Sequence, residues 1–382
     1  MGGVQFSTFY LIKKLSTNSK FKIQLLLPKK GQFSNLCEQN LIPYTLYKSR
    51  PMLSSSISIF RDSLRIPNPF TWIYNILQIY YNSKSVRNIL KRQKNAVILS
   101  KGLNSHFVSI IANWKLSNKL IWHLQDLISQ RFGGILLKLM NFLADIGPDF
   151  IVCDGKSIYN SLNMHSQSKA DIILNGVEAD LFQRTHRLRE LGREELNIPL
   201  HTYVIGHVGR FTPWKGQLKL VEAFIDYSKQ NNQAILLLVG APVFDSYTYI
   251  NDIKNQISKY GLDDKIILTG FRSDLDRMFS IMDLFVYPSL EKDTSPLVLL
   301  SALSSGLPVA ASSIESLQEI IEKVPAIPLF NPLNKSHLIN IYQKYEANHL
   351  RAKTSKTIRL EYQNHFNMNI HTQKMMEVLD SI

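Results

Sequence analysis

Two cations beside a glycine turn, in the segment Val208–Gly216, constrain what this chain can form more than any other feature. The apolar run Tyr203–Val208 before the turn is typical of a buried strand, and an amphipathic helical pattern follows it. Gly209 lets a ligand approach the backbone, while Arg210 and Lys215 supply a forked donor and a point charge. This strand-to-helix junction predicts an anion site suited to a diphosphate. The alternative is a solvated basic loop.

A second junction of the same kind lies further along the chain. The run Asp283–Tyr287 predicts a strand that ends at Pro288. Ser295 is a good N-cap and Pro296 fits the first position of a helix, which Gly306 would end. The sequence therefore predicts another loop that enters a helix after a strand.

The first turn of this second helix would also attract an anion. The backbone N–H groups of Leu297 and Val298 would point out of the helix N-terminus, where the helix dipole favours negative charge. Ser301 lies one turn further, on the same helical face as Leu297. The two junctions together strengthen the prediction of a site for phosphate groups.

Apolar runs alternate with helical patterns along most of the chain. Strands separated by helices predict parallel sheets in α/β layers. The strands that we expect are Lys22–Leu27, Ala96–Leu99, Leu120–Trp122, Phe150–Val152, Asp171–Leu174, Tyr203–Val208, Ala234–Val239, Lys265–Leu268, Leu284–Tyr287 and Val309–Ala311.

The two junctions resemble those of the retaining glycosyltransferases of family 4, also called glycosyl transferases group 1, which use a nucleotide-sugar donor and have the GT-B fold. Arg210 and Lys215 keep the spacing of the family motif G-R-x4-K-G. Other positions that match family motifs are Gly31–Tyr44, Ile121–Asp126, Asn175–Phe182, Pro288–Ser289, Leu297, Ala302, Gly306, Pro308–Val309 and Phe366–Met368. The resemblance covers nearly all of the chain.

The resemblance implies an α/β chain with two Rossmann-like domains that face a central cleft. We expect residues 1–180 to form the acceptor-side domain and residues 181–360 the domain that binds the nucleotide-sugar. Residues 361–382 would form a C-terminal helix that packs back toward the N-terminal domain.

The resemblance also implies roles for individual residues. Arg210 and Lys215 would stabilise the leaving diphosphate, and Asp293 would bind hydroxyls of the donor sugar. His123 would contact the donor sugar or an acceptor hydroxyl; the alternative is a structural histidine at a strand end. We expect neither a metal nor a cofactor. The donor-binding residues that we expect are Gly2, Gly3, Gly209, Phe271, Ser295, Pro296, Leu297, Val298 and Ser301.

The chain departs from the family pattern in two places. Ser301 stands where the family has a Glu that accepts hydrogen bonds from the ribose hydroxyls, so donor affinity or nucleotide preference is expected to differ. Gly2 and Gly3 match a loop that follows the first strand in the family, and that strand is missing here. We expect either a late start of the chain or a compromised domain.

Positive charge is concentrated in the first third of the chain. Residues 1–120 contain 18 Lys and Arg but only two acidic residues, Glu38 and Asp62, whereas the remainder is close to neutral. This asymmetry predicts an anionic membrane surface or a lipid-diphosphate acceptor as a partner. A recognisable nucleic-acid motif is missing, so we do not expect nucleic acid to bind. The alternative for the basic region is a solvated face without a partner. The apolar stripe Ile73–Tyr81 could contact a membrane or an acceptor; the alternative is that it belongs to the core.

Other sequence features favour a cytoplasmic protein, peripheral on the inner face of the membrane. No apolar run is long enough to span a bilayer, and Lys13 and Lys14 interrupt the N-terminal run that a signal peptide would need. The two cysteines, Cys37 and Cys153, have neither metal-ligand spacing nor a disulfide framework.

The predicted function is transfer of a sugar from a nucleotide-sugar to a glycan or lipid-linked acceptor with retention of configuration, in cell-surface polysaccharide or glycolipid synthesis. The sequence does not distinguish a UDP-sugar from a GDP-sugar. Two alternatives stay open: a non-catalytic GT-B homologue that acts as a binding or scaffold protein, and a nucleotide-sugar epimerase on the same fold.

Overall fold

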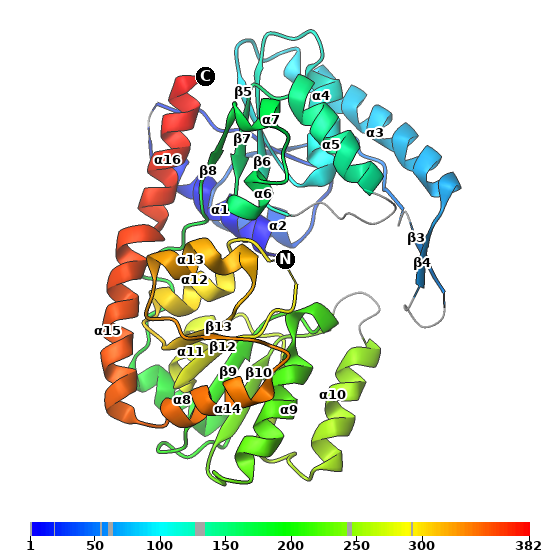
Figure 1. Ribbon diagram of the computed structural model, residues 1–382. Coiled ribbons are helices and arrows are strands. Elements are labelled where there is room, and N and C mark those ends of the chain that lie inside the picture. Colours follow the sequence, from blue (N-terminus) through cyan, green and yellow to red (C-terminus); the bar gives the residue numbers. More distant parts are fainter. Residues whose placement is uncertain are drawn as a thin grey trace. The chain divides into compact units, whose positions relative to one another are not determined.

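The structure is a computed structural model that describes residues 2–18, 20–53, 56–59, 64–126, 134–242, 247–291 and 293–382. Met1, which precedes the two glycines, lies outside these ranges. The chain divides into two compact units, Met1–Leu174 with Thr372–Ile382, and Asn175–His371. Each unit contains parallel strands joined by helices, which confirms the predicted α/β class (Figure 1).

The second unit is built on a six-stranded parallel sheet with the order β11-β10-β9-β12-β13-β14. Strands β9, β10 and β12 are buried along their whole length, as expected for strands with helices on both faces. The bounds are β9 Val204–Val208, β10 Ile235–Val239, β11 Ile266–Gly270, β12 Leu284–Tyr287, β13 Val309–Ser312 and β14 Leu329–Phe330. The strands that the sequence predicted in this unit are therefore confirmed.

Strand β9 is the point at which the strand order reverses. The chain continues from β9 to β10 on one side of the sheet, while β12 pairs with β9 on the other side. Ligands of open α/β sheets bind at the carboxyl ends of the strands beside such a reversal. The fold therefore brings the two predicted anion-binding junctions, one after β9 and one after β12, to the same edge of the sheet.

Helices α9 and α14 pack together over this sheet (Figure 1), where Phe224, Leu236 and Tyr342 belong to one buried core. The helices that belong wholly to this unit are α8 His186–Glu195, α9 Gln217–Ser228, α10 Tyr247–Lys259, α11 Leu275–Ile281, α12 Leu297–Ser304, α13 Gln318–Lys323, α14 Lys335–Lys344 and α15 Asn348–His365. Helix α16, Met368–Ser381, begins in the second unit and ends in the first. In the first unit, its end is held by Lys20, whose Nζ lies 2.6 Å from Asp380 Oδ1.

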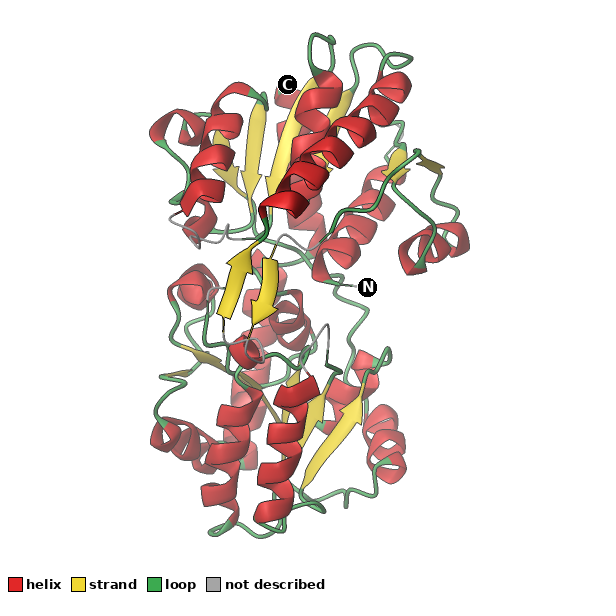
Figure 2. Cartoon of the chain, turned by 90° about the vertical axis from the view of Figure 1, so that its right-hand side faces the viewer, coloured by secondary structure: helices red, strands yellow, loops and turns green. Residues whose placement is uncertain are grey.

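The described residues of the first unit form three separate sheets: the parallel pair β1-β2, the antiparallel hairpin β3-β4 and the parallel sheet β5-β6-β7-β8 (Figure 2). Among the described residues no strand joins β1 to β5, and the first element is helix α1. The strands are β1 Leu25–Leu27, β2 Tyr44–Leu46, β3 Ser56–Ile59, β4 Leu64–Pro67, β5 Val97–Lys101, β6 Lys119–Leu124, β7 Phe150–Cys153 and β8 Ala170–Ile172. The helices are α1 Gly3–Ser16, α2 Gln32–Gln39, α3 Pro69–Leu90, α4 Leu103–Asn113, α5 Ile135–Ile146, α6 Lys156–Tyr159 and α7 Met164–Gln167.

Helix α3 exposes apolar residues in its first half, whereas Val86 and Leu90 in its second half are buried in a core. Asn82 and Asn75 on its buried side each bind the backbone of the preceding loop, at Arg50 and Leu53 respectively. The exposed side chains include Phe70, Ile73, Ile76, Leu77 and Tyr80. The core interpretation of the Ile73–Tyr81 stripe is therefore wrong for these residues. No helix in the described part of the chain is long and apolar enough to span a bilayer.

Candidate active site

The loops after β9 and β12 are joined to each other by backbone contacts. Gly216 has a φ of 74°, and a Cβ at this position would lie 2.1 Å from the carbonyl oxygen of Pro288. The Leu290 N–H donates to the Trp214 carbonyl at 2.8 Å. Only glycine combines this conformation with such a close approach, so Gly216 sets the distance between the two loops.

Lys215 and Asp293 form an ion pair across these loops, and the Tyr287 hydroxyl hydrogen-bonds to the same carboxylate oxygen of Asp293. Lys215 Nζ lies 3.0 Å from that hydroxyl. Burial lowers the pKa of Lys215, whereas the neighbouring Asp293 acts in the opposite direction. The three buried or half-buried groups therefore hold one another in place at the carboxyl end of the sheet.

Arg210 differs from Lys215 in being exposed. Its guanidinium carbon lies 6.0 Å from the centre of the Trp214 ring, and Lys215 Nζ lies 4.4 Å from the same centre. Among the described residues the Arg210 side chain forms no hydrogen bond or ion pair. Trp214 thus interacts with both cations, and Arg210 is the one whose donors are open to an anion.

The start of helix α12 lies one residue later than the sequence predicted. Pro296 is the N-cap, because its ψ of 116° is extended rather than helical, and Leu297 is the first helical residue. The prediction of Ser295 as N-cap is therefore wrong. Ser295 has a φ of 41° and its hydroxyl oxygen accepts the N–H of Asn175 at 2.8 Å. The first-turn N–H groups, including those of Leu297 and Val298, still point out of the helix N-terminus.

Ser301 is buried and lies one turn into α12. Its hydroxyl donates to the Leu297 carbonyl at 2.8 Å, which is a bond within its own helix. This bond uses the hydroxyl hydrogen within the helix, and a serine offers a ribose diol no charged acceptor.

Two further predicted donor-binding residues follow strands β9 and β11, which lie on either side of β10 in the sheet. Gly209 follows β9, and a Cβ at Gly240 would lie 1.9 Å from the Gly209 carbonyl oxygen, so the backbone after β9 touches the backbone after β10. Phe271 follows β11 and its side chain is 72% exposed. An exposed phenyl ring at this edge of the sheet is suited to stacking on a planar ligand.

His123 belongs to the first unit, where it is fully buried at the end of β6. Its Nε2 hydrogen-bonds to Asp154, which follows β7. Burial and then the charge of Lys101 lower the pKa of His123, while Asp154 opposes this shift. Because burial is outweighed by the neighbouring His123 and Lys101, the pKa of Asp154 stays below its usual value. An ionised carboxylate only accepts, so Nε2 of His123 carries the hydrogen.

A polar network connects this pair to helix α1. Gln125 Nε2 donates to Asp154 Oδ2 at 2.9 Å and to Ser7 Oγ at 3.1 Å, and Lys101 Nζ donates to Ser7 Oγ at 3.2 Å. Such a network also accounts for His123 as a structural residue. Its burial favours that alternative, and a catalytic role for His123 stays a prediction.

Gly2 and Gly3 lie at the exposed start of α1, where Gly2 is the N-cap. No atom lies within 4 Å of a Cβ placed on Gly2. The described structure therefore gives no steric reason for glycine at this position, and its predicted contact with a donor stays a prediction.

Tyr287 and Asp154 are polar residues of these networks that sequence reasoning missed. Both lie at or just after the carboxyl end of an apolar strand, which is the signal that could have identified them. Among the described residues no group of three or more His, Cys, Asp or Glu side chains is placed to hold a metal ion.

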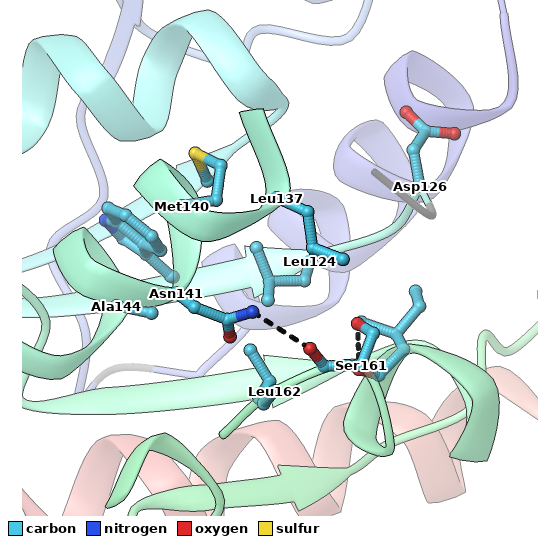
Figure 3. Close-up of a pocket in the computed structure, with 10 residues that line it drawn as sticks. Leu124, Asp126, Leu137, Met140, Asn141, Ala144, Ser161 and Leu162 are labelled. Atoms are coloured by element: carbon cyan, nitrogen blue, oxygen red, sulfur yellow. Dashed lines mark hydrogen bonds between the residues drawn. The ribbon is translucent and has the colours of Figure 1, made fainter. Parts of the chain in front are cut away.

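Figure 3 shows a separate small pocket in the first unit, beneath α5. It is lined mainly by apolar side chains, among them Leu124, Met140 and Leu162. Asn141 Nδ2 donates to the Ser161 carbonyl at 3.1 Å on its wall. The pocket contains neither the cations nor the helix N-terminus described above, so it is not part of the candidate anion site.

Comparison with known proteins gives a family match for the part of the chain that contains Arg210, Lys215 and Asp293. Residues 189–351 match the family described as "Glycosyl transferases group 1". The chain is similar to the UDP-Gal:alpha-D-GlcNAc-diphosphoundecaprenol alpha-1,3-galactosyltransferase of Escherichia coli, with 25% identity over 79% of this chain and 74% of that protein. It is also similar to a D-inositol 3-phosphate glycosyltransferase of Corynebacterium glutamicum (strain R), with 29% identity over 39% of this chain and 36% of that protein.

Solved structures resemble the whole chain. Anabaena Alr3699/HepE in complex with UDP has a TM-score of 0.82 and 21% identity, and the similarity covers 100% of this chain and 97% of that one. At this level of identity the likeness shows the fold alone. Residues 189–351 therefore match the glycosyl transferases group 1 family, and the chain has the GT-B fold.

Proposed function

We propose that this protein transfers a sugar from a UDP-sugar to a lipid-linked or glycan acceptor. The observation that carries the proposal is the arrangement at the carboxyl edge of the second unit's sheet. There Arg210 has no hydrogen bond or ion pair to the described residues, Lys215 is fixed by Asp293, and helix α12 begins shortly after Asp293. The Escherichia coli relative is named for a UDP-sugar and a diphosphoundecaprenol acceptor, and the Anabaena structure contains UDP. Both proteins support a uridine nucleotide, and the Escherichia coli relative supports a lipid-linked acceptor. We therefore also propose a role in cell-surface polysaccharide or glycolipid synthesis.

The reaction would depend on charge stabilisation at the leaving diphosphate. Breaking the sugar–phosphate bond leaves negative charge on the diphosphate, and fixed cations and helix N–H groups stabilise that charge without reorganising. Arg210 and Lys215 would supply the cations, and Asp293 would accept hydrogen bonds from donor-sugar hydroxyls. We propose a retaining transfer that needs no metal or cofactor, as the resemblance to family 4 implies.

The function is tested by combining nucleotide binding with transfer. Thermal unfolding should shift upward with UDP and less with GDP, and UDP should be released from a UDP-sugar only when a polyprenyl-diphosphate acceptor is present. Binding of nucleotide without any acceptor-dependent release, over a panel of sugars and acceptors, would favour the scaffold alternative. Conversion of the UDP-sugar to its epimer without an acceptor would identify the epimerase alternative.

Replacement of Ser301 by Glu tests how the pocket differs from the family pattern. A carboxylate can accept two charge-assisted hydrogen bonds from a ribose diol, so Ser301→Glu should tighten UDP binding by roughly 1–3 kcal/mol in calorimetry. Ser301→Ala is the matched control and should leave the affinity unchanged, because the native hydroxyl binds within its own helix. Weaker or unaltered binding by a stable Glu variant would show that the pocket is built around serine.

We also propose that the first unit attaches to an anionic membrane, on the inner face of the cell membrane. The exposed apolar side of α3 lies in the part of the chain with 18 Lys and Arg and two acidic residues. Each basic side chain near an anionic surface contributes about 1 kcal/mol, and exposed aliphatic and aromatic groups can enter the headgroup region.

Vesicle binding should therefore rise with the content of anionic lipid and fall with salt. The double substitution Ile76→Asp and Tyr80→Asp should reduce sedimentation with vesicles at least about fivefold, because it places charge in the apolar face. Leu360→Asp is a matched control, since Leu360 is an exposed leucine of α15 in the second unit. Equal binding to neutral vesicles, or an equal loss in the control, would refute the proposed surface.

A further inference from the structure

The short segment Asn175–Val177 opens the second unit and is bound on one side to the loop before α12. The Asn175 N–H donates to the Ser295 hydroxyl oxygen at 2.8 Å. The Asn175 side-chain Nδ2 donates to the Ser295 carbonyl oxygen at 3.1 Å. Both residues are buried, so these bonds are shielded from water. One asparagine thus holds Ser295 by its side chain and by its backbone.

On its other side, the segment is fixed to the start of helix α16. The Val177 N–H donates to the Phe366 carbonyl at 3.0 Å, and the Met368 N–H donates to the Val177 carbonyl at 2.9 Å. A Cβ on Gly176 would lie 2.7 Å from the Cβ of His371 and 2.9 Å from the Cα of Met368. The segment therefore has little freedom to move, and Asn175 is a rigid support for Ser295.

Ser295 needs such support because its backbone conformation is unfavourable. Its φ of 41° lies in the left-handed region, which a residue with a Cβ seldom occupies unless its surroundings hold it there. Pro296 follows directly, and its carbonyl accepts the N–H groups of Leu299 and Leu300 at 3.0 and 3.2 Å. The conformation of Ser295 thus sets the direction of the Pro296 carbonyl, and with it the axis of the first turn of α12.

We propose that Asn175 is a positioning residue for the anion site: it holds Ser295 in the left-handed conformation and so aims the first turn of α12. The proposal rests on the function proposed above in so far as the anion is the diphosphate of a UDP-sugar. Asn175 touches no substrate in this role. It acts through Ser295 and Pro296, and it affects how well ordered the first turn of α12 is.

Hydrogen exchange in the protein without nucleotide tests the inference independently of the reaction. In Asn175→Ala, the amides of Leu299 and Leu300 should exchange at least about tenfold faster, because the Ser295 carbonyl loses its bond from the Asn175 side chain. Asn141→Ala is the matched control, since Asn141 Nδ2 also donates to a carbonyl, that of Ser161, at 3.1 Å in the first unit (Figure 3). Unchanged exchange at Leu299 and Leu300 in Asn175→Ala would overturn the inference whether or not UDP binds.

Calorimetry with UDP then separates positioning from general stability. Asn175→Ala should raise the Kd for UDP roughly 5- to 10-fold while the melting temperature stays near that of Asn141→Ala. Ser295→Gly relieves the strain, because glycine readily adopts a positive φ, so loss of the Asn175 Nδ2 bond to the carbonyl of residue 295 should have less than about a twofold effect on Kd in that background. Equal effects in both backgrounds would overturn the positioning role, whereas failure of the wild-type protein to bind UDP would count against the proposed function alone.

Discussion

Arg210→Ala and Lys215→Ala should each lower kcat for sugar transfer by at least about 100-fold, the usual cost of removing one fixed stabiliser of developing charge. The two variants should differ in other respects. Arg210 is exposed and forms no hydrogen bond or ion pair among the described residues, so its loss removes a charge and leaves the loops intact. Lys215 is buried against Asp293 and Tyr287, and its loss leaves the Asp293 carboxylate without its cation.

Lys215→Ala should therefore also raise the KM for the donor and lower the melting temperature, whereas Arg210→Ala should change mainly kcat. Steady-state release of UDP at varied donor concentration measures both constants. Lys219→Ala is a suitable control, because Lys219 lies on the neighbouring helix α9 and pairs with Glu222 at 2.9 Å. Near-normal kcat in both variants, with the control unaffected, would refute the proposal that these cations bind the diphosphate.

Asp283→Ala should lower the free energy of unfolding of the second unit by about 3–5 kcal/mol, the usual cost of leaving a buried charge without its partner. The Arg193 side chain is fully buried, with Nη2 lying 2.9 Å from Asp283 Oδ2. Arg189 Nη2 lies 2.8 Å from Oδ1 of the same carboxylate, and the Val204 N–H donates to Oδ2 at 2.9 Å. Burial lowers the pKa of Arg193 to about 10, so its guanidinium stays charged at neutral pH.

Removal of Asp283 would thus leave two arginines and one strand N–H without their shared acceptor. Denaturant unfolding followed by tryptophan fluorescence, with Trp214 as the reporter within the second unit, measures the loss. Asp226→Ala is the matched control: Asp226 pairs with Lys229 and Lys335, both of them exposed, and such a pair contributes at most about 1 kcal/mol. Equal losses of unfolding free energy in the two variants would show that the buried Arg193–Asp283 pair stabilises the protein no more than an exposed pair does.

The local pattern of the sequence was sufficient to predict most strands and both strand-to-helix junctions. Strands β9 and β12 lie within one residue of the runs Tyr203–Val208 and Asp283–Tyr287, because a continuous apolar run suits a strand with helices on both faces. The spacing of Arg210 and Lys215 likewise depends only on residues close together in the chain. The one-residue error at Ser295 arose because a bond from distant Asn175 replaced the expected capping bond.

Tertiary structure alone decided which of these local features meet. Strand β12 lies beside β9 through hydrogen bonds between distant segments, and these bonds bring Asp293 and Tyr287 to Lys215. Helical periodicity likewise shows that α3 has an apolar side, but not which side is buried. In the structure Asn75 and Asn82 bond to the loop at Leu53 and Arg50, while Ile73, Ile76 and Tyr80 are exposed. The physical reason is the same in both cases: the propensity of a segment depends on its own residues, whereas pairing depends on the free energy of contacts with residues far along the chain.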